Sequence, residues 1–330
     1  MQAIVLVGGE GTRLRPLTDD VPKPALTLVD RPFLAYMIEW LGSHGVTEAV
    51  LACGFLPDVL QEALGEGEHA GVRLRYVTEP DRRGTAGAIR FAAEALGDEL
   101  DDRFLALNGD VLTDLDLGAL IAAHHERAAR ATIALYPVED SAAYGLVDVD
   151  ETGAVTAFVE KTGEPVPGEI NAGAYFLERS VLDLIPAGQE VSIEREVFPR
   201  LIDAGLSALR LDGYWMDIGT PERYLQASWD ILEGRVVTQV RATAPGLLVG
   251  AGTAIASAAT VGPRAVLAPG CRVEAGASVT GSVLLEGCSV GAGARVNGSI
   301  LAPGVTVGAG AELDGDVLGR DAKVSAPATP

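Results

Sequence analysis

The sequence predicts an α/β domain with a mainly parallel sheet and flanking helices, followed by a left-handed parallel β-helix. Two observations support this fold class. Up to about residue 235, short aliphatic runs alternate with longer segments of helical apolar spacing, as in a parallel sheet with crossover helices. After about residue 245 the chain is rich in Gly, Ala and Val and repeats about every six residues. We therefore predict two domains, residues 1–240 and 241–330.

The strands of the first domain are predicted where aliphatic runs lead into Gly, Pro, Asp or Asn. These runs are Ala3–Val7, Ala49–Ala52, Val72–Val77 and Phe104–Leu107. Between them, apolar residues at three- and four-residue spacing predict helices over Phe33–Leu41, Val59–Leu64 and Ala86–Leu96. Strands that alternate with helices in this way give a Rossmann-like sheet.

Two later segments carry turn and cap signals. Asp150–Gly153 separates two apolar-rich runs, Leu146–Val149 and Val155–Val159, and predicts a hairpin turn. Thr220 followed by Pro221 predicts an N-cap and a proline in the first helical position, opening a helix that runs to about Glu233.

The second domain is predicted from its repeat. Aliphatic residues recur at a strict six-residue step, and then at steps of five or six: Val249, Ile255, Val261, Leu267, Val273, Val279, Leu285, Val290, Val296, Leu301, Val307, Leu313, Leu318 and Val324. A chance alignment would not continue for so long. A hexapeptide repeat of this kind indicates a parallel β-helix in which each aliphatic residue points into a prism-like core.

Charge and length limit the possible partners. The 46 acidic and 25 basic residues give a net charge of −21, with no basic run. We therefore expect neither a nucleic acid polymer nor a membrane surface as a partner. The apolar run of Met1–Val7 is too short for a signal-peptide core, and no apolar stretch approaches the roughly 18 residues of a membrane span. We expect a cytoplasmic protein.

The cysteines and histidines show no metal-ligand spacing. Cys53, Cys271 and Cys288 lie far apart, and we expect them to be buried, reduced and structural. The histidines are His44, His69, His124 and His125, and none has a second candidate ligand nearby in the sequence. Metal chemistry based on His or Cys is therefore not expected.

The strongest local motif follows the first predicted strand. It runs Gly8-Gly9-Glu10-Gly11-Thr12-Arg13-Leu14-Arg15-Pro16-Leu17-Thr18 and continues at Pro22-Lys23-Pro24. Backbone N–H groups of a glycine loop can approach phosphates, and Arg13, Arg15 and Lys23 add positive charge. The motif lacks the Gly-Lys-Ser/Thr of a Walker A loop, and Leu14 stands where a dinucleotide fingerprint needs its third glycine. We expect it to bind a polyphosphate.

This motif resembles the signature of the sugar-phosphate nucleotidylyltransferases, the pyrophosphorylases that make NDP-sugars. The resemblance continues in the family's order through Glu79-Pro80 with Gly84-Thr85-Ala86-Gly87, Asn108-Gly109-Asp110, Tyr144-Gly145, Phe158-Val159-Glu160-Lys161, Asn171-Ala172-Gly173 and Trp215-Met216-Asp217-Ile218-Gly219. Together with the hexapeptide repeats, it covers nearly the whole chain. It implies that an NTP and a sugar-1-phosphate form an NDP-sugar and pyrophosphate.

The resemblance also implies the roles of individual residues. Catalysis falls to Arg13, Lys23, Lys161, Asp110 and Asp217, and the two aspartates hold Mg²⁺. The sugar contacts Gly145, Glu160 and Asn171. The nucleotide contacts Val7, Gly8, Gly9, Gly11, Thr12, Glu79, Gly84, Thr85, Asn108 and Gly109. Independently, the 25 basic residues include only three lysines, and two of them, Lys23 and Lys161, fall in these motifs, where a compact ammonium suits a phosphate oxygen.

The segments Ser192–Pro199 and Tyr214–Gly219 look most like those of mannose-1-phosphate guanylyltransferases, which favours GTP and mannose-1-phosphate. A carboxylate at Glu79 can accept two hydrogen bonds from guanine, although it can instead pair with Arg82 or Arg83. Asp110 can equally cap a turn. A glucose-1-phosphate uridylyl- or thymidylyltransferase, a guanylyltransferase for another sugar and a non-catalytic regulatory homologue remain alternatives.

The role of the predicted β-helix follows from what it lacks. Hexapeptide-repeat acyltransferases use a histidine base, and no histidine follows His125. We therefore assign this domain to assembly or regulation and expect a homo-oligomer.

Overall fold

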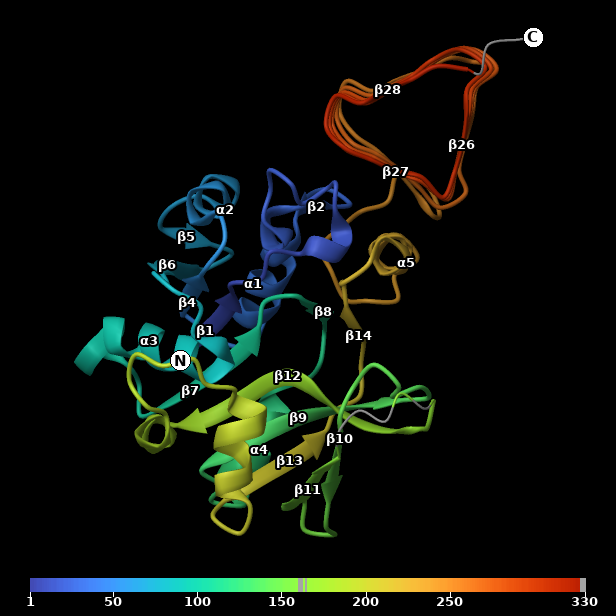
Figure 1. Cartoon of the computed structure of the whole chain (residues 1–330). Coiled ribbons are helices and arrows are strands. Elements are labelled where there is room, and N and C mark those ends of the chain that lie inside the picture. The colour runs from blue at the N-terminus through green and yellow to red at the C-terminus, as the bar shows by residue number, and fades with distance from the viewer. Residues whose placement is uncertain (160–162, 164, 327–330) are drawn as a thin grey trace. The chain divides into compact units, whose positions relative to one another are not determined.

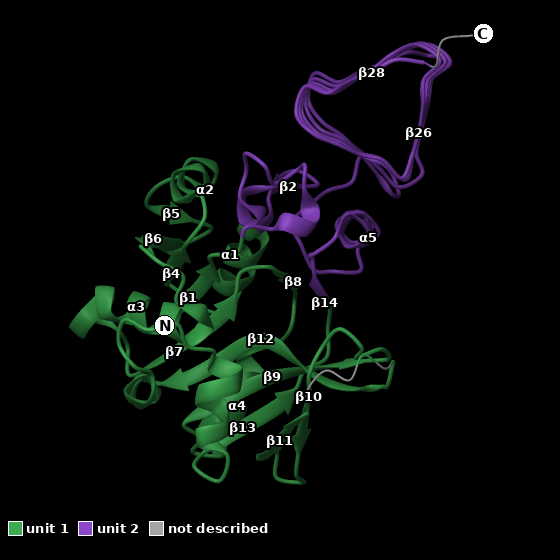
Figure 2. Cartoon of the chain, viewed as in Figure 1, with its two compact units in different colours: residues 1–9, 34–215 green, residues 10–33, 216–330 purple. Residues whose placement is uncertain are grey.

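The chain folds into two compact units, shown in Figure 2. The computed structural model describes residues 1–159, 163 and 165–326. Unit 1 contains residues 1–9 and 34–215, and unit 2 contains residues 10–33 and 216–330. Unit 2 therefore combines most of the glycine-loop motif with the C-terminal part of the chain.

Unit 1 is built on a mixed sheet with flanking helices (Figure 1). Its strands are β1 (Gln2–Val7), β4 (Glu48–Cys53), β5 (Glu68–His69), β6 (Val72–Thr78), β7 (Arg103–Asn108), β9 (Ala131–Val138), β10 (Leu146–Val149), β11 (Val155–Val159), β12 (Gly168–Glu178) and β13 (Leu206–Arg210). The order is β11-β10-β12-β7-β1-β4-β6-β5, and β9 pairs with β12 and β13. The helices are α1 (Phe33–Ser43), α2 (Pro57–Leu64), α3 (Gly84–Leu96) and α4 (Leu117–Glu126).

Several short elements connect these strands and helices. The short strands are β2 (Thr27–Leu28), β3 (Arg31–Pro32), β8 (Val111–Thr113) and β14 (Trp215–Asp217). Single 3₁₀ turns cover Thr12–Leu14, Lys23–Ala25, Gly97–Glu99, Arg179–Leu184 and Phe198–Leu201, and a π-helical turn covers Ile193–Val197. No helix in the described ranges is long and apolar enough to cross a membrane.

The predicted strands and helices of the first domain are confirmed, within one or two residues at most ends. The hairpin of β10 and β11 has the predicted bounds, and Thr220 caps α5 (Pro221–Leu232) by accepting a hydrogen bond from the Arg223 N–H. The sheet is parallel across β7, β1, β4 and β6, whereas β12 runs antiparallel to β7, β9 and β10. The predicted α/β class is correct, and the sheet itself is mixed.

The parallel half of the sheet positions the functional motifs. Leu6 pairs with Asn108, Val7 with Cys53, and Cys53 with Thr78, so these strands end together. The residues of β1, β4 and β7 are mostly buried, which explains the continuous aliphatic runs of these strands, whereas β6 is buried only at Val72 and Leu74. The loops that follow these ends contain Gly8 and Glu79, at the edge where parallel sheets bind ligands.

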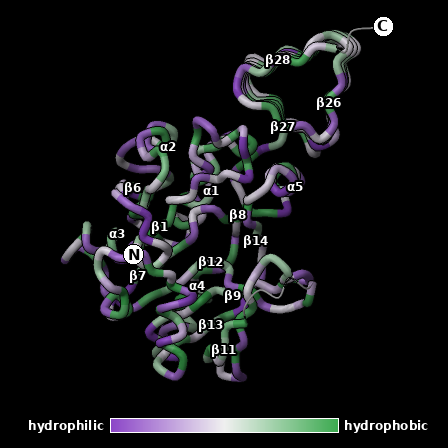
Figure 3. The backbone as a smooth tube through the Cα atoms, viewed as in Figure 1, coloured by the Kyte–Doolittle hydropathy of each residue, from purple (hydrophilic) through white to green (hydrophobic). Residues whose placement is uncertain are grey.

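The C-terminal part of unit 2 is a parallel β-helix. Three sheets stack β15-β18-β21-β24-β27, β16-β19-β22-β25-β28 and β17-β20-β23-β26, and all the paired strands run parallel. The bounds are β15 (Leu247–Val249), β16 (Ala254–Ile255), β17 (Thr260–Val261), β18 (Ala265–Leu267), β19 (Arg272–Val273), β20 (Ser278–Thr280), β21 (Val283–Leu284), β22 (Ser289–Val290), β23 (Arg295–Asn297), β24 (Ile300–Leu301), β25 (Thr306–Val307), β26 (Glu312–Asp314), β27 (Val317–Leu318) and β28 (Lys323–Val324). Figure 3 colours hydrophobic residues green, and green segments occur in the strands of both units.

One residue of the predicted repeat is displaced by one position. Leu267 pairs with Leu284, and Leu284 with Leu301, so Leu284 rather than Leu285 belongs to the β-helix core. The prediction that Leu285 points into the prism is wrong. Leu285 lies on the outside and, with Leu17 and Leu26 of the same unit, lines a cavity of about 140 Å³.

The displacement has a local cause at the corner between β20 and β21. Ser282 donates its hydroxyl to the Thr280 carbonyl at 2.7 Å, and Gly281 takes the left-handed conformation with φ 54°. The Ser299 N–H then donates to Ser282 Oγ at 3.0 Å, linking this corner to the next coil. These hydrogen bonds complete a corner that is one residue shorter, so the step there is five residues.

The three cysteines are buried and reduced, as predicted. Cys53 ends β4, and burial raises its pKa to about 12, with a further contribution from the charge of Glu79. Cys271 and Cys288 belong to the β-helix core and donate to the Leu285 and Ala302 carbonyls, respectively. Their role is structural.

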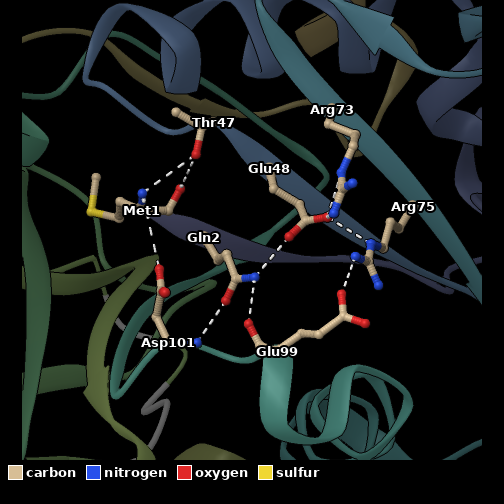
Figure 4. Close-up of polar contacts among 8 residues, drawn as sticks. All are labelled: Met1, Gln2, Thr47, Glu48, Arg73, Arg75, Glu99 and Asp101. Carbon is tan, nitrogen blue, oxygen red and sulfur yellow. Dashed lines mark hydrogen bonds and ion pairs between the residues drawn. The ribbon is translucent and has the colours of Figure 1, made fainter.

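At the start of β1 and β4, a buried carboxylate organises a polar network (Figure 4). Glu48 is 6% exposed, accepts from Gln2 Nε2 at 2.7 Å and from Arg73 Nε at 2.8 Å, and lies 2.6 Å from Arg75 Nε. Burial raises the pKa of Glu48, but the hydrogen bonds from Gln2 and Arg73 and the charges of Arg75 and Arg73 lower it to a net value below the usual one. The network joins β1, β4 and β6 at their amino ends.

We predict that Glu48→Gln lowers the free energy of unfolding by about 1–3 kcal/mol, because the cationic partners lose a charged acceptor. Because the folded-state pKa of Glu48 is lowered, its stabilising contribution is present above the unfolded value of about 4.3 and is lost as the pH falls through the folded value. Urea unfolding at pH 7 and at pH 3.5 measures both effects.

The matched control is Glu312→Gln. Glu312 pairs with Arg295 at 3.1 Å, but both side chains are largely exposed. Its loss should change stability by less than about 0.5 kcal/mol. Equal losses in the two variants would show that burial of Glu48 adds nothing.

Candidate active site

In unit 1, two glycines and a glutamate meet beside the ends of β1 and β4. A Cβ added at Gly54 would lie 3.0 Å from Gly8 Cα, so the two backbones pass in close contact. A Cβ at Gly8 would lie 3.7 Å from Glu79 Oε1, and the Glu79 N–H donates to the Cys53 carbonyl at 2.8 Å. The structure therefore brings together Gly8 and Glu79, two residues assigned to the nucleotide.

The Glu79 carboxylate is half-buried. Burial raises its pKa above the usual value, and the charge and backbone N–H of Arg83 lower it in part. Arg82 is 89% exposed and pairs with Glu190 at 3.3 Å. Of the two arginines that could compete for this carboxylate, Arg82 thus pairs elsewhere, and the hydrogen bond from Arg83 comes from its backbone N–H.

Gly84 and Gly87 at the start of α3 allow a neighbouring segment to pack against the helix. A Cβ at Gly84 would lie 2.6 Å from the Val191 carbonyl oxygen, and one at Gly87 would lie 2.5 Å from the Gln189 carbonyl oxygen. The Thr85 hydroxyl accepts from the Ile193 N–H at 2.8 Å. These residues hold the segment 189–193 against α3, a packing role that the sequence did not indicate.

Asn108 and Gly109 close the end of β7. A Cβ at Gly109 would lie 2.7 Å from the Leu6 carbonyl oxygen, so only a glycine lets this turn pack on β1. Gly173 is in the left-handed conformation, and a Cβ there would lie 2.7 Å from Asn108 Nδ2. Asp110 follows in the two-residue turn between β7 and β8 and is half-buried.

Asn171 belongs to a hydrogen-bonded group that the sequence only partly predicted. Its Nδ2 donates to the Tyr175 hydroxyl and to Glu194 Oε1, both at 2.8 Å, and its Oδ1 accepts from the Gly173 N–H at 2.9 Å. Burial raises the pKa of Tyr175 well above its usual value, and the negative charges of Glu194 and, less strongly, Asp110 raise it further. Asp110 and Glu194 thus lie near one buried hydroxyl.

Aromatic side chains of unit 1 surround the predicted sugar-binding turn at Tyr144-Gly145. Trp215 stacks on Tyr136 with ring centroids 5.6 Å apart, and it meets Tyr144 edge-on at the same distance. Trp215 Nε1 donates to the Ala172 carbonyl at 2.8 Å. Gly145 lies beside Val159, whereas Glu160 and Lys161 lie outside the described residues.

In unit 2, the glycine-loop segment folds into a compact loop with its own internal contacts. Gly11 has φ 64°, its carbonyl accepts from the Thr18 hydroxyl at 2.9 Å, and a Cβ there would lie 3.1 Å from Lys23 Cβ. Leu14 and Thr18 are completely buried. The segment thus has its own packing, and it places Gly11 beside Lys23.

Among the predicted catalytic side chains of this segment, Lys23 has the best-defined surroundings. Its side chain is 8% exposed, and Nζ lies 3.4 Å from Asp217 Oδ1. The other oxygen of the same carboxylate, Oδ2, lies 3.4 Å from Arg223 Nη1. A nearly buried ammonium needs such a partner, because an unpaired charge there would be costly. Two of the catalytic residues implied by resemblance, Lys23 and Asp217, are therefore in contact.

Arg13 lies close to Gly219 and Asp217, but its side chain is exposed. A Cβ at Gly219 would lie 2.6 Å from Arg13 Nη2 and 3.3 Å from Asp217 Oδ1, so the guanidinium lies against the Gly219 backbone. Within residues 1–159, 163 and 165–326, no ion pair or hydrogen bond of the Arg13 guanidinium is found. Arg13 can therefore receive a phosphate without giving up a partner.

The two predicted metal ligands belong to different units, Asp110 to unit 1 and Asp217 to unit 2. Among the described residues, no group of three or more His, Cys, Asp or Glu side chains has an arrangement suited to a metal ion. Each aspartate follows or ends a strand, as predicted. Their metal-binding role stays a prediction.

Residues 2–234 match the family model described as "Nucleotidyl transferase", and residues 243–328 match the "GMPPB C-terminal domain". The chain belongs to the nucleotidyl transferase family. The resemblance of the glycine-loop motif to this family is thereby confirmed.

Several curated relatives of this nucleotidyl transferase are similar over most of its length. A mannose-1-phosphate guanylyltransferase of Mycobacterium tuberculosis is 39% identical over 297 residues, which cover 84% of this chain and 82% of the relative. A probable mannose-1-phosphate guanylyltransferase 1 of Oryza sativa is 40% identical over 285 residues, covering 84% and 79%. The crystal structure of HddC from Yersinia pseudotuberculosis complexed with GMP-PN aligns with a TM-score of 0.61 at 28% identity, covering 70% of this chain and 99% of that one.

Two residues that contact predicted site residues of this nucleotidyl transferase, Glu194 and Arg223, were not predicted from the sequence. Glu194 lay within a segment used only to judge the subfamily, yet it bonds to Asn171. Arg223 contacts Asp217. A signal for Arg223 was present, because an arginine in the first turn of a helix opposes the helix dipole and needs a compensating anion.

We predict that Gly219→Ala lowers kcat/KM for the nucleotide about tenfold, equivalent to about 1.4 kcal/mol of transition-state binding. The added Cβ would displace the Arg13 guanidinium, which is the flexible end of an exposed side chain, so the melting temperature should hardly change. Steady-state kinetics and thermal unfolding measure the two effects.

The comparison variants are Arg13→Ala and the double variant Arg13→Ala/Gly219→Ala. If Gly219 acts by making room for Arg13, the double variant loses no more activity than Arg13→Ala alone. Independent, multiplying losses would mean that Gly219 serves another purpose.

Proposed function

We propose that this nucleotidyl transferase forms GDP-mannose and pyrophosphate from GTP and mannose-1-phosphate. The observation that carries the proposal is the cluster of Arg13, Lys23 and Asp217, built from the family signature within unit 2. The names of the similar mannose-1-phosphate guanylyltransferases support the choice of base and sugar.

The chemistry is phosphoryl transfer. A phosphate oxygen of the sugar-1-phosphate attacks the α-phosphorus of the NTP, a new P–O bond forms, and the bond to the bridging oxygen breaks as pyrophosphate leaves with the electron pair. Positioning and charge neutralisation provide most of the catalysis in such a reaction. In our proposal, the exposed Arg13 binds the NTP phosphates and the departing pyrophosphate, and Lys23 neutralises charge near the reacting phosphates.

The carboxyl edge of unit 1 is suited to a nucleotide. In our proposal, the residues Val7–Gly9 and Gly109 bring backbone close to the ligand. At Gly109 the packing on β1 leaves no room for a larger side chain. Asn108 and Gly84-Thr85 border the same edge. The half-buried Glu79 beside Gly8 reads guanine by accepting from N1–H and the exocyclic amine, whereas uracil and thymine offer one N–H on that edge.

The sugar is assigned to the group around Asn171. A carboxamide and a carboxylate supply donors and acceptors for the hydroxyls of a sugar. We add Glu194 to the predicted Gly145, Glu160 and Asn171, because it shares a hydrogen bond with Asn171 and is exposed. Lys161 is proposed to bind the sugar phosphate.

Asp110 and Asp217 are proposed to hold Mg²⁺. Hard carboxylate oxygens are the ligands that Mg²⁺ prefers. The two oxygens of Asp217 lie beside Lys23 and Arg223 in unit 2. When bound, Mg²⁺ supplies charge neutralisation between two phosphorylated substrates. We also propose that the enzyme is a cytoplasmic homo-oligomer whose β-helix serves assembly or regulation.

The deciding experiment is a matrix of NTPs against sugar-1-phosphates, scored by pyrophosphate release. We expect GTP with mannose-1-phosphate to give the highest kcat/KM. A preference for UTP or dTTP with glucose-1-phosphate would overturn the guanylyl assignment and leave the reaction class intact. A complete absence of turnover would favour the regulatory alternative.

We predict that Asp110→Asn and Asp217→Asn each lower kcat about 100-fold or more while the protein stays folded, because each removes a charged metal ligand. An excess of chelator should reproduce the loss in the wild-type enzyme. Pyrophosphate release and circular dichroism measure activity and folding. Wild-type turnover in excess chelator would contradict the Mg²⁺ assignment.

We predict that Glu79→Gln weakens the use of GTP by about 1–3 kcal/mol of transition-state binding, with less effect on UTP. Because the pKa of Glu79 is raised, its carboxylate becomes protonated at a higher pH than an ordinary glutamate of about 4.3. Wild-type kcat/KM for GTP should therefore begin to fall at a correspondingly higher pH. Equal losses for GTP and UTP in the variant would remove Glu79 from base recognition.

A further inference from the structure

Arg223 occupies a position that its helix does not favour. It lies in the first turn of α5, where its N–H donates to the capping Thr220 hydroxyl at 3.4 Å. The amino end of a helix carries partial positive charge, so an acidic residue such as the neighbouring Glu222 suits this turn and an arginine does not. Its presence calls for a specific anionic partner.

That partner is Asp217, which Arg223 contacts at two points. Nη1 lies 3.3 Å from the Asp217 carbonyl oxygen and 3.4 Å from its carboxylate Oδ2. One guanidinium therefore contacts both the backbone and the side chain of the same residue. Lys23 lies on the other carboxylate oxygen, Oδ1, at 3.4 Å. The two oxygens of Asp217 are thereby distinguished by their partners.

The helix that carries Arg223 is itself firmly attached within unit 2. Tyr224, the next residue, is 1% exposed and donates its hydroxyl to the Thr27 carbonyl of the glycine-loop segment. Ser228 is completely buried and donates to the Tyr224 carbonyl at 2.9 Å. A functional side chain is held most accurately when its support is rigid, and α5 provides such a support.

We propose that Arg223 is a positioning residue for nucleotidyl transfer: it fixes the Asp217 carboxylate, with Oδ1 on Lys23, in the orientation in which that carboxylate would help to hold a divalent cation. This inference deepens the proposed function and rests on it. Arg223 acts through Asp217, so its loss misplaces a ligand and leaves the phosphate-binding Arg13 in place.

The test is a double-mutant cycle between Arg223→Gln and Asp217→Asn, measured by pyrophosphate release from GTP and mannose-1-phosphate. Arg223→Gln should lower kcat/KM about tenfold and raise the Mg²⁺ concentration for half-maximal activity. In the Asp217→Asn background it should cause no further loss. Arg223→Lys should restore activity only in part, because the shorter lysine side chain does not place its ammonium where the guanidinium Nη1 contacts both the carbonyl oxygen and Oδ2 of Asp217.

The control is Arg272→Gln, which removes an exposed arginine of the β-helix in the same unit and should leave both constants unchanged. A second readout is independent of turnover: binding of Mn²⁺ to the protein without substrates, followed by the loss of the free-ion EPR signal. Arg223→Gln and Asp217→Asn should both weaken it, and Arg272→Gln should not.

Three results would overturn the proposal. Wild-type kinetics of Arg223→Gln would show that the contact is without consequence for the reaction. A further loss in the Asp217→Asn background would show that Arg223 binds a substrate phosphate directly. A fall in melting temperature with unchanged Mn²⁺ binding would show a structural ion pair. If the wild-type enzyme makes no GDP-mannose, the proposed function fails, while the Mn²⁺ comparison still decides the role of Arg223.

Discussion

The ion pair between Lys23 and Asp217 is the long-range contact around which the candidate site of unit 2 is arranged. A lysine that is 8% exposed cannot keep its charge without a partner, and that partner lies 194 residues later in the chain. The pairing brings the glycine-loop segment to the end of β14, just before α5. Consistently, residues 10–33 belong to the same compact unit as residues 216–330, although the intervening chain forms unit 1.

The same contact links structure to chemistry. A carboxylate surrounded by Lys23 and Arg223 has its negative charge stabilised before any ligand binds, and Arg13 stays exposed beside it. In the proposed function, such a site would attract phosphates through its cations, and its carboxylate would serve a divalent ion. Preorganised charge of this kind is what transfer of a phosphoryl group needs, because the protein itself does little covalent chemistry.

In unit 1, close backbone packing at glycines shapes the region of the predicted nucleotide-binding residues. Gly84 and Gly109 are required because a neighbouring carbonyl oxygen occupies the space of a side chain. The glycines of a motif that resembles a ligand-binding loop are thus also needed for close packing of neighbouring segments. The two explanations are compatible, since a backbone that packs without side chains also lets a ligand approach its N–H groups.

Much of this fold was determined by the sequence alone, because its signals are local. Apolar spacing predicted the strands and helices of unit 1, the Thr220-Pro221 pair predicted the start of α5, and the aliphatic repeat predicted the β-helix. The signature from Gly8 to Lys23 indicated the family, because those residues must be contiguous to form the loop.

Only the tertiary structure decided features that depend on residues distant in the chain. The step of five that places Leu284 in the core comes from hydrogen bonds between Ser282 and the next coil, which a period counted along one strand does not contain. The contacts of Asn171 with Glu194 and of Arg223 with Asp217 depend on how separate elements pack, and no spacing specifies that. Local periodicity determines which elements form, whereas long-range packing and charge pairing determine which side chains meet.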